Sequence, residues 1–208
     1  VVLWTKSPRN MLEHSSLRQA LEELVSAGVQ IALQLTVTGF GGSFVEPGIS
    51  PWPETMDLLA ALLDSGLIEA RAVTIRYDPL LQIACTGLGV FSNCRSELFR
   101  AIVAAASKLT IDRMVTSRAD LDGYPRAAAR LKDVGLEAIG PSEETARQFV
   151  SQMDGVCSSH GIELAVCCSP AVELGSAGCI DGRRYNELAD EHGQRGQAPC
   201  SERRHNAT

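Results

Sequence analysis

Residues 15–38 have the sequence SSLRQALEELVSAGVQIALQLTVT, and this stretch decides the fold class. Its first half predicts a helix from about Ser15 to Ala27, because leucines and Val25 recur at helical spacing and Gly28 follows as a stop signal. Its second half, Gln30–Thr38, is apolar and β-branched, which predicts a buried strand. A helix followed at once by a strand is the repeating unit of a parallel α/β fold.

The same alternation continues on both sides of this stretch. Further strands are expected at 1–5, 72–77, 111–116 and 162–167, and helices at 54–65, 95–107, 127–133, 143–159 and 186–191. Asp78-Pro79 is expected to end the third strand, and an irregular segment should follow it. Strands separated by such helices imply right-handed crossovers and a parallel sheet. We therefore predict an α/β fold of the parallel (β/α) barrel-like type, incomplete in this chain, with an open doubly wound sheet as the alternative.

Composition limits the possible classes of protein. The 208 residues suit a single α/β domain, and the formal net charge of −6 argues against a general nucleic-acid-binding surface. No apolar run reaches the ~18 residues that a membrane span requires. Seven cysteines, odd in number and irregularly spaced, favour a reducing cytoplasm over a disulfide framework. Because the chain starts in a strand-like run without Met and ends in a polar stretch, we expect an internal fragment of a longer protein.

Thiols gather near the end of the chain, at Cys167, Cys168, Cys179 and Cys200. Their spacing lacks the Cys-x(2–4)-Cys pattern typical of zinc, but iron–sulfur clusters accept ligands from separate loops. Neighbouring residues on a strand point to opposite faces, so Cys167 and Cys168 can share one ion only if the strand ends there. A metal site that uses at least two of these cysteines is one hypothesis, and scattered inert thiols are the alternative. Cys157 belongs to an apolar helix stripe and is expected in the core.

Polar residues and glycine follow the predicted strands. Lys6 comes after the first, Gly39 after the second, and Arg76 and Asp78 after the third, where parallel α/β folds place functional residues. An Arg beside an Asp can hold an anion while the Asp moves a proton, or the two can form an internal ion pair that fixes the loop. Lys6 is a candidate anion-binding residue. Gly39 and Glu46, on the long loop that follows, are candidate cofactor-binding residues.

Several short motifs, taken in order along the chain, resemble one family. They are Trp4-Thr5-Lys6-Ser7-Pro8, Thr36-x-Thr38-Gly39-Phe40, Val45-Glu46-Pro47, Arg76-Tyr77-Asp78-Pro79, Cys179-Ile180-Asp181 and Gln194-Arg195. In this combination the chain resembles an uncharacterised bacterial family known as domain of unknown function 1848. Its members look like relatives of radical SAM barrel enzymes, and some are similar to spore photoproduct lyase.

The resemblance implies an iron–sulfur or other metal-dependent enzyme, either a lyase or a redox enzyme. Cys168, Cys179 and Cys200 would be ligands, with Cys167 as the alternate. The catalytic candidates Lys6, Arg76 and Asp78 would line a pocket for an anionic substrate or cofactor group. Family members carry an upstream strand and a Cys-rich C-terminal end that this chain lacks.

The radical SAM Cys-x3-Cys-x2-Cys signature does not occur in the chain, so its residues give no support to the use of SAM as a cofactor. The competing hypothesis is a non-catalytic metal-binding or regulatory α/β module, in which the thiolates only staple the C-terminal loops. The two hypotheses differ in one geometric respect: an enzyme would have Arg76 and Asp78 open onto the same cavity as the cysteines.

Overall fold

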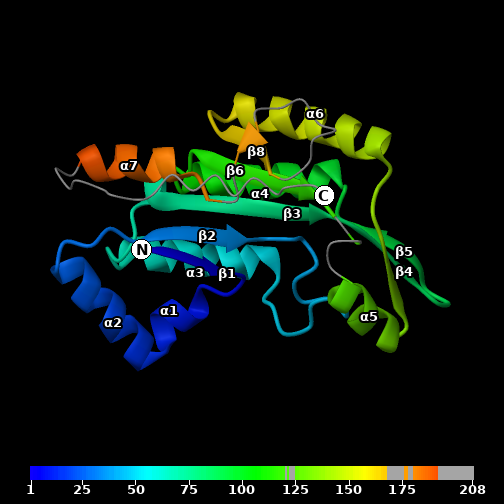
Figure 1. Cartoon of the computed structure of the whole chain (residues 1–208), viewed down its shortest axis with the longest axis horizontal. Coiled ribbons are helices and arrows are strands. Elements are labelled where there is room, and N and C mark those ends of the chain that lie inside the picture. Colours follow the sequence, from blue (N-terminus) through cyan, green and yellow to red (C-terminus); the bar gives the residue numbers. More distant parts are fainter. Residues whose placement is uncertain (120, 122–124, 168–175, 178–179, 192–208) are drawn as a thin grey trace.

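The computed structural model describes residues 1–119, 121, 125–167, 176–177 and 180–191. Within them the chain forms a six-stranded parallel sheet, ordered β1-β2-β3-β6-β8-β9 (Figure 1). Its strands are β1 (Val2–Thr5), β2 (Ala32–Thr36), β3 (Val73–Leu80), β6 (Arg113–Arg118), β8 (Glu163–Cys167) and β9 (Ser176–Ala177). Except for β9, these correspond to the strands expected from the sequence.

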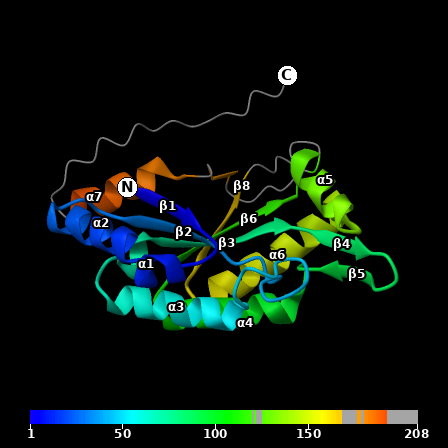
Figure 2. The same cartoon turned by 90° about the horizontal axis from the view of Figure 1, so that it is seen from below.

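Four long helices connect the strands and closely match the expected ones. They are α2 (Ser15–Ser26), α3 (Trp52–Asp64), α4 (Ser96–Lys108) and α6 (Glu143–Ser159). Helices α3, α4 and α6 lie on one side of the sheet (Figure 2), where their apolar stripes meet every second strand residue. Leu33, Ile75 and Met114 are fully buried there. Shorter helices are α1 (Arg9–Glu13), α5 (Pro125–Asp133) and α7 (Gly182–Glu191), with a 3₁₀ turn at Ala70–Ala72.

The segment expected to be irregular is instead an antiparallel hairpin. Strands β4 (Gln82–Cys85) and β5 (Gly89–Ser92) pair with each other, and β7 (Leu136–Ile139) pairs with β4. Strands of four residues carry too little periodicity to be recognised in the sequence. The expectation that Asp78-Pro79 ends the third strand was also wrong, because β3 continues to Leu80. The pairing of β3 with β6 shifts register between Tyr77 and Leu80, which accommodates a proline that has no N–H to donate.

The prediction of an α/β fold with a mostly parallel sheet is confirmed. The described parallel strands follow one another in chain order, whereas a doubly wound sheet reverses its order at a switch point. No closed barrel is present among the described residues, since β1 pairs only with β2 and β9 only with β8. The fold gives no support to the expectation that the chain is a fragment. In the described part of the chain, no helix has the length and apolarity needed to cross a membrane.

The side of the sheet opposite α3, α4 and α6 carries polar side chains, and we call it the polar face. Strand alternation assigns to it the side chains of Trp4, Gln34, Thr36, Thr74, Arg76, Asp78, Arg113, Ser117 and Cys167. Helix α7 lies on this side (Figure 2). It contacts the face through Tyr185, whose hydroxyl accepts a hydrogen bond from Gln34 Nε2 at 2.6 Å. The polar face is therefore closed by α7 towards one end.

Candidate functional site

The carboxyl end of the polar face gathers four of the predicted residues that the structure describes. Lys6 follows β1, Arg76 and Asp78 lie on β3, and Cys167 ends β8. All four reach the same end of the sheet because its strands are parallel. The geometric expectation that these residues come together at strand ends is thus met, while their functional roles stay predictions.

Arg76 and Asp78 form a buried ion pair. Their side chains are only 2% and 10% exposed, and Arg76 Nη2 donates to Asp78 Oδ2. Arg76 Nη1 also donates to Gln34 Oε1 at 3.3 Å, so the guanidinium serves a neutral and a charged acceptor. Ser117 Oγ donates to the same Asp78 oxygen at 3.5 Å. The pair on β3 is therefore fixed by side chains from both neighbouring strands, Gln34 on β2 and Ser117 on β6.

The buried environment changes the proton affinity of both groups. Burial raises the pKa of Asp78 above its ordinary value, and attraction to Arg76 and Lys6 with the Ser117 hydrogen bond offsets this only in part. Burial opposes the charge of Arg76, but Asp78 and the thiol of Cys167 outweigh it and raise its pKa. Arg76 therefore stays a cation. Asp78 is moved towards the pH range in which a carboxyl group can exchange a proton.

Trp4 completes this group, and sequence reasoning did not select it. Its ring lies over Arg76, with 4.3 Å from the guanidinium carbon to the ring centroid, which is a cation–π geometry. The indole Nε1 donates to Thr36 Oγ1 at 3.0 Å, yet Trp4 remains 52% exposed. The usable signal in the sequence was strand alternation, which places Trp4 on the same face of the sheet as Gln34 and Arg76.

Lys6 and Glu46 form a second, more open ion pair. Lys6 Nζ bonds to Glu46 Oε1, and the two side chains are 41% and 14% exposed. Thr38 Oγ1 donates to the other carboxylate oxygen, so Glu46 is held from both sides. This pair lies at the rim of the site, whereas Arg76 and Asp78 lie at its base.

Glycines shape the loop that presents Glu46. Gly42 N donates to Ile49 O at 2.7 Å, and a Cβ on Gly41 would lie 2.2 Å from the Ser50 carbonyl oxygen. At Gly39, φ is +80° and a Cβ would lie 2.6 Å from a Leu98 methyl group. Packing and backbone geometry therefore explain Gly39 without a ligand, and its cofactor-binding role stays a prediction.

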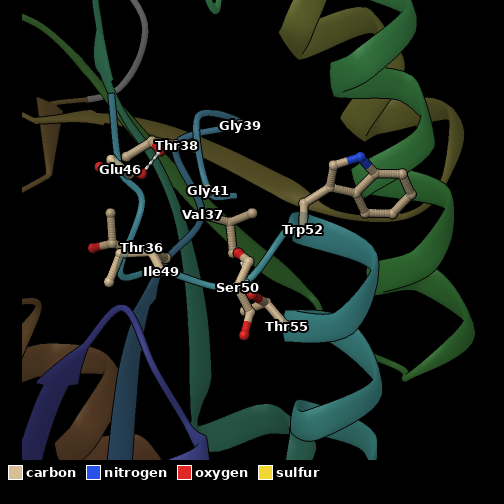
Figure 3. Close-up of a pocket in the computed structure, with 10 residues that line it drawn as sticks. All are labelled: Thr36, Val37, Thr38, Gly39, Gly41, Glu46, Ile49, Ser50, Trp52 and Thr55. Carbon is tan, nitrogen blue, oxygen red and sulfur yellow. Dashed lines mark hydrogen bonds between the residues drawn. The ribbon is translucent and has the colours of Figure 1, made fainter. Parts of the chain in front are cut away.

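A small hollow lies beneath this loop (Figure 3). It encloses about 190 Å³, part of it open to solvent, and its lining includes Thr38, Glu46 and Trp52. In Figure 3 the hydrogen-bonded Thr38 and Glu46 lie on one side, and the Trp52 ring points away from them. Ligand pockets usually measure about 300–1,000 Å³. The hollow can hold a few atoms at most, so it is no cavity for a complete substrate.

Comparison with known proteins supports the family suggested by the motifs. The family model described as "Domain of unknown function (DUF1848)" matches residues 1–206. The chain belongs to the DUF1848 family. No curated protein matches it. A solved structure, "ChuY: An Anaerobillin Reductase from Escherichia coli O157:H7", covers 96% of this chain and 91% of its own at 12% identity, with a TM-score of 0.29. With so low a TM-score, the similarity supports no conclusion about fold or function. The family match does not show a relation to radical SAM enzymes or spore photoproduct lyase.

Of the four cysteines predicted as metal ligands in the DUF1848 chain, one lies among the described residues. Cys168, Cys179 and Cys200 lie outside the described residues, and within the described ranges no three His, Cys, Asp or Glu side chains come together. Cys167 is described: it is 1% exposed and packs with two apolar side chains of the polar face. Cys157 is fully buried in the core, as expected. The complete ligand set therefore stays a prediction.

Asp181, from the Cys-Ile-Asp motif, has a structural role. Its Oδ1 accepts hydrogen bonds from the backbone N–H groups of Arg183 at 3.1 Å and Arg184 at 3.4 Å, which caps the start of α7. Its Oδ2 accepts from Arg113 Nη2 at 2.7 Å. Asp181 therefore attaches α7 to the amino end of the polar face of the DUF1848 chain, away from the site around Arg76.

Proposed function

We propose that the DUF1848 chain is a metal-dependent enzyme whose active site is the carboxyl end of the polar face. An iron–sulfur cluster held by C-terminal cysteines would lie beside a subsite for an anionic substrate, and the reaction would be a lyase or redox reaction. One observation carries the proposal: Arg76 interacts with both Asp78 and Cys167. A buried carboxyl group with a raised pKa and a candidate ligand thus share one buried cation.

Cys167, the proposed cluster ligand that the structure describes, is compatible with this chemistry. Cys167, with Cys168, Cys179 and Cys200, would bind the cluster as thiolates, the form that a neighbouring cation such as Arg76 favours. A bound cluster would supply electron transfer or Lewis acidity. Burial prevents Arg76 from meeting the substrate freely, so its role is to balance charge and to hold Asp78 in place.

Asp78 and Lys6 would act on the substrate itself. Asp78, with its raised pKa, would hold or move a proton. Lys6 is 41% exposed and is the cation that an anionic substrate group would meet first. Each role corresponds to the exposure of the group: the exposed cation binds and the buried acid exchanges protons.

Two further features support parts of the proposal. Six parallel strands in chain order match the strand sequence of a (β/α) barrel, the fold of the radical SAM enzymes that the motifs resemble. Cys85, Cys94, Cys157 and Cys167 form no disulfide bond within the described part of the chain, which agrees with a reducing, cytoplasmic location. No residue of the chain supports SAM as a cofactor, and we do not propose it.

The competing module, in which thiolates only staple loops, explains the geometry less well. Structural metal sites need a closed ligand set and no polar pocket beside it. Arg76 and Asp78 lie on the same end and face as Cys167, although neither is needed to staple a C-terminal loop. The hollow beneath the Glu46 loop is lined by none of these three residues, so it is not the shared cavity that would distinguish the two hypotheses. Their common placement alone favours the enzyme.

The test is anaerobic purification of the full-length protein, followed by reconstitution and iron and sulfide analysis. We expect a coloured protein containing both elements, and loss of both when Cys167→Ser and Cys168→Ser are combined. The double change prevents one cysteine from replacing the other. The matched control is Cys157→Ala, which removes a buried thiol outside the site and should leave the iron content unchanged. A colourless, metal-free parent after reconstitution would contradict the proposal.

A further inference from the structure

Trp4 is a large aromatic residue held rigid while half of it faces solvent. Its Nε1–H is bonded to Thr36 and one face of its ring rests on the Arg76 guanidinium, yet the residue is 52% exposed. Exposed side chains normally keep rotamer freedom that binding must then remove. Trp4 has already lost that freedom in the folded protein. Its exposed surface is thus preorganised for contact with another ring.

The cation beneath the ring restricts what can stack on it. An aromatic face attracts cations because the ring quadrupole is negative there, and Arg76 already uses this attraction from below. A second cation on the exposed surface would be repelled by the first. A neutral ring, or a ring that bears a negative group, would not be repelled by Arg76. Trp4 therefore favours flat, conjugated, neutral or anionic ligands over cationic ones.

Lys6 offers a site for the negative group. Lys6 follows Trp4 by two residues, just after β1 ends at Thr5, and its charge acts to lower the pKa of Asp78. It therefore lies close to the Arg76–Asp78 pair, over which the Trp4 ring is placed. An ammonium group has three N–H donors, and Lys6 is 41% exposed while bonded to Glu46. It can bind an anionic oxygen without giving up Glu46, which Thr38 holds in place.

We propose that Trp4 and Lys6 form one subsite for a planar conjugated ring that carries an anionic group. The ring stacks on the exposed surface of Trp4, and the anion bonds to Lys6. Nucleoside monophosphates and aromatic carboxylates share this chemistry, and the experiment below separates them. The inference deepens the proposed function, because it names the class of substrate or cofactor that would occupy the active site.

A covering role for Trp4 is the rival explanation. Covering Arg76 from water requires only an apolar side chain, whereas the bond to Thr36 fixes the plane of the ring. A cover would also be expected to bury itself, and Trp4 leaves about half of its surface exposed. The two roles differ in their consequences for ligand binding, which can be measured directly.

The experiment uses full-length, cluster-free protein with Trp52→Phe, which leaves Trp4 as the single tryptophan of the two in the sequence. Fluorescence is titrated with adenosine monophosphate, 4-hydroxybenzoate, adenosine and inorganic phosphate. We expect saturable quenching by adenosine monophosphate, by 4-hydroxybenzoate or by both. The compound that binds shows whether the subsite takes a nucleoside monophosphate or an aromatic carboxylate. Adenosine should bind more weakly than its monophosphate, phosphate alone should not quench, and benzylammonium should fail to compete.

Variants then assign the two contacts by calorimetry with the compound that binds. Trp4→Leu keeps an apolar cover over Arg76 but removes the ring, and should weaken binding about tenfold or more, as is typical of lost ring stacking. Trp4→Phe should retain part of the affinity. Lys6→Met should weaken binding of the anionic compound and leave that of adenosine unchanged. If Trp4→Leu does not fold, the fluorescence titration of the parent protein and the affinities measured with Lys6→Met still show whether the subsite exists.

The outcomes separate this inference from the proposed function. Failure of every ring–anion compound to quench Trp4, or unchanged affinity in Lys6→Met and Trp4→Leu, overturns the subsite even if the cluster assembles. Saturable binding by cluster-free protein that never takes up iron supports the subsite and counts against the metal enzyme.

Discussion

The two ends of the polar face both place an arginine among carboxylates, but with different consequences. At the amino end, Arg113 bonds to Glu163 at 3.0 Å and to Asp181 at 2.7 Å, and these partners are 60% and 30% exposed. At the carboxyl end, the partner of Arg76 is Asp78, only 10% exposed. Arg113 joins β6 to β8 and to the start of α7. Arg76 and Asp78 lie two residues apart on the same strand, so their ion pair joins no separate elements.

This difference indicates which pair has a structural purpose. An ion pair between elements stabilises their arrangement, and Arg113 with Asp181 attaches α7 in that way. A buried pair within one strand loses hydration, which costs several kcal/mol per ion before compensation. Its hydrogen bonds to Gln34 and Ser117 reach only β2 and β6, which already pair with β3 through the backbone. The pair at the carboxyl end is therefore better explained by the site that it forms with Trp4, Ser117 and Cys167. Substitutions at Asp78, Asp181 and Lys6 test this contrast.

The largest expected effect on stability is at Asp78. Asp78→Ala leaves the guanidinium of Arg76 buried without its charged partner, which should lower the free energy of unfolding by about 3–5 kcal/mol. Urea denaturation monitored by circular dichroism measures the change. Asp78→Asn, which keeps an acceptor for Arg76, should cost clearly less. A loss below about 1 kcal/mol in Asp78→Ala would show that Arg76 does not depend on this carboxylate.

A smaller effect is expected at Asp181, the corresponding carboxylate of the amino end. Asp181→Ala removes the cap of α7 and a partly exposed ion pair, and should cost about 1–2 kcal/mol. Asp181→Asn keeps a capping oxygen and should recover part of the loss. Asp181 follows the proposed ligand Cys179 by two residues, so iron content after reconstitution should match the parent in Asp181→Asn, which keeps the cap. Loss of the cluster in Asp181→Asn would overturn the separation of the two ends.

The fold was predictable from the sequence wherever long apolar runs recur. Gln30–Thr38 and the helix before it are recognisable because a buried strand and an amphipathic helix each leave a regular pattern. The hairpin of β4 and β5 was missed, since its strands of four residues are too short for a pattern to emerge. Proline at position 79 indicated a strand end, but a register shift allows β3 to continue past it.

The site was predictable only in part, for a related reason. Lys6, Arg76 and Asp78 were found because strand ends are identifiable in a sequence and parallel strands place them together. Trp4 was not, because its role depends on a contact with Arg76 that is distant in the sequence. Thr38 and Ser117 each donate one hydroxyl hydrogen bond to a carboxylate of the site, and the sequence does not indicate these two contacts.

The smallest expected effect on stability is at Lys6. Lys6→Met keeps the length of the side chain and its apolar contacts while removing the charge. The ion pair with Glu46 is 41% exposed on the lysine side, and exposed pairs contribute about 0–1 kcal/mol. Thr38 still bonds to Glu46 in the variant, so the carboxylate keeps a partner. We therefore expect urea denaturation to show nearly the stability of the parent.

Glu46→Gln serves as the matched control, because it removes the opposite charge of the same pair and keeps an acceptor for Thr38. Both variants should unfold within about 1 kcal/mol of the parent. A loss above about 2 kcal/mol in Lys6→Met alone would mean that Lys6 stabilises Asp78 as well, since the two groups attract each other. The rim and the base would then form one charge network. Near-parent stability would instead leave Lys6 available to bind a ligand at little cost to the fold.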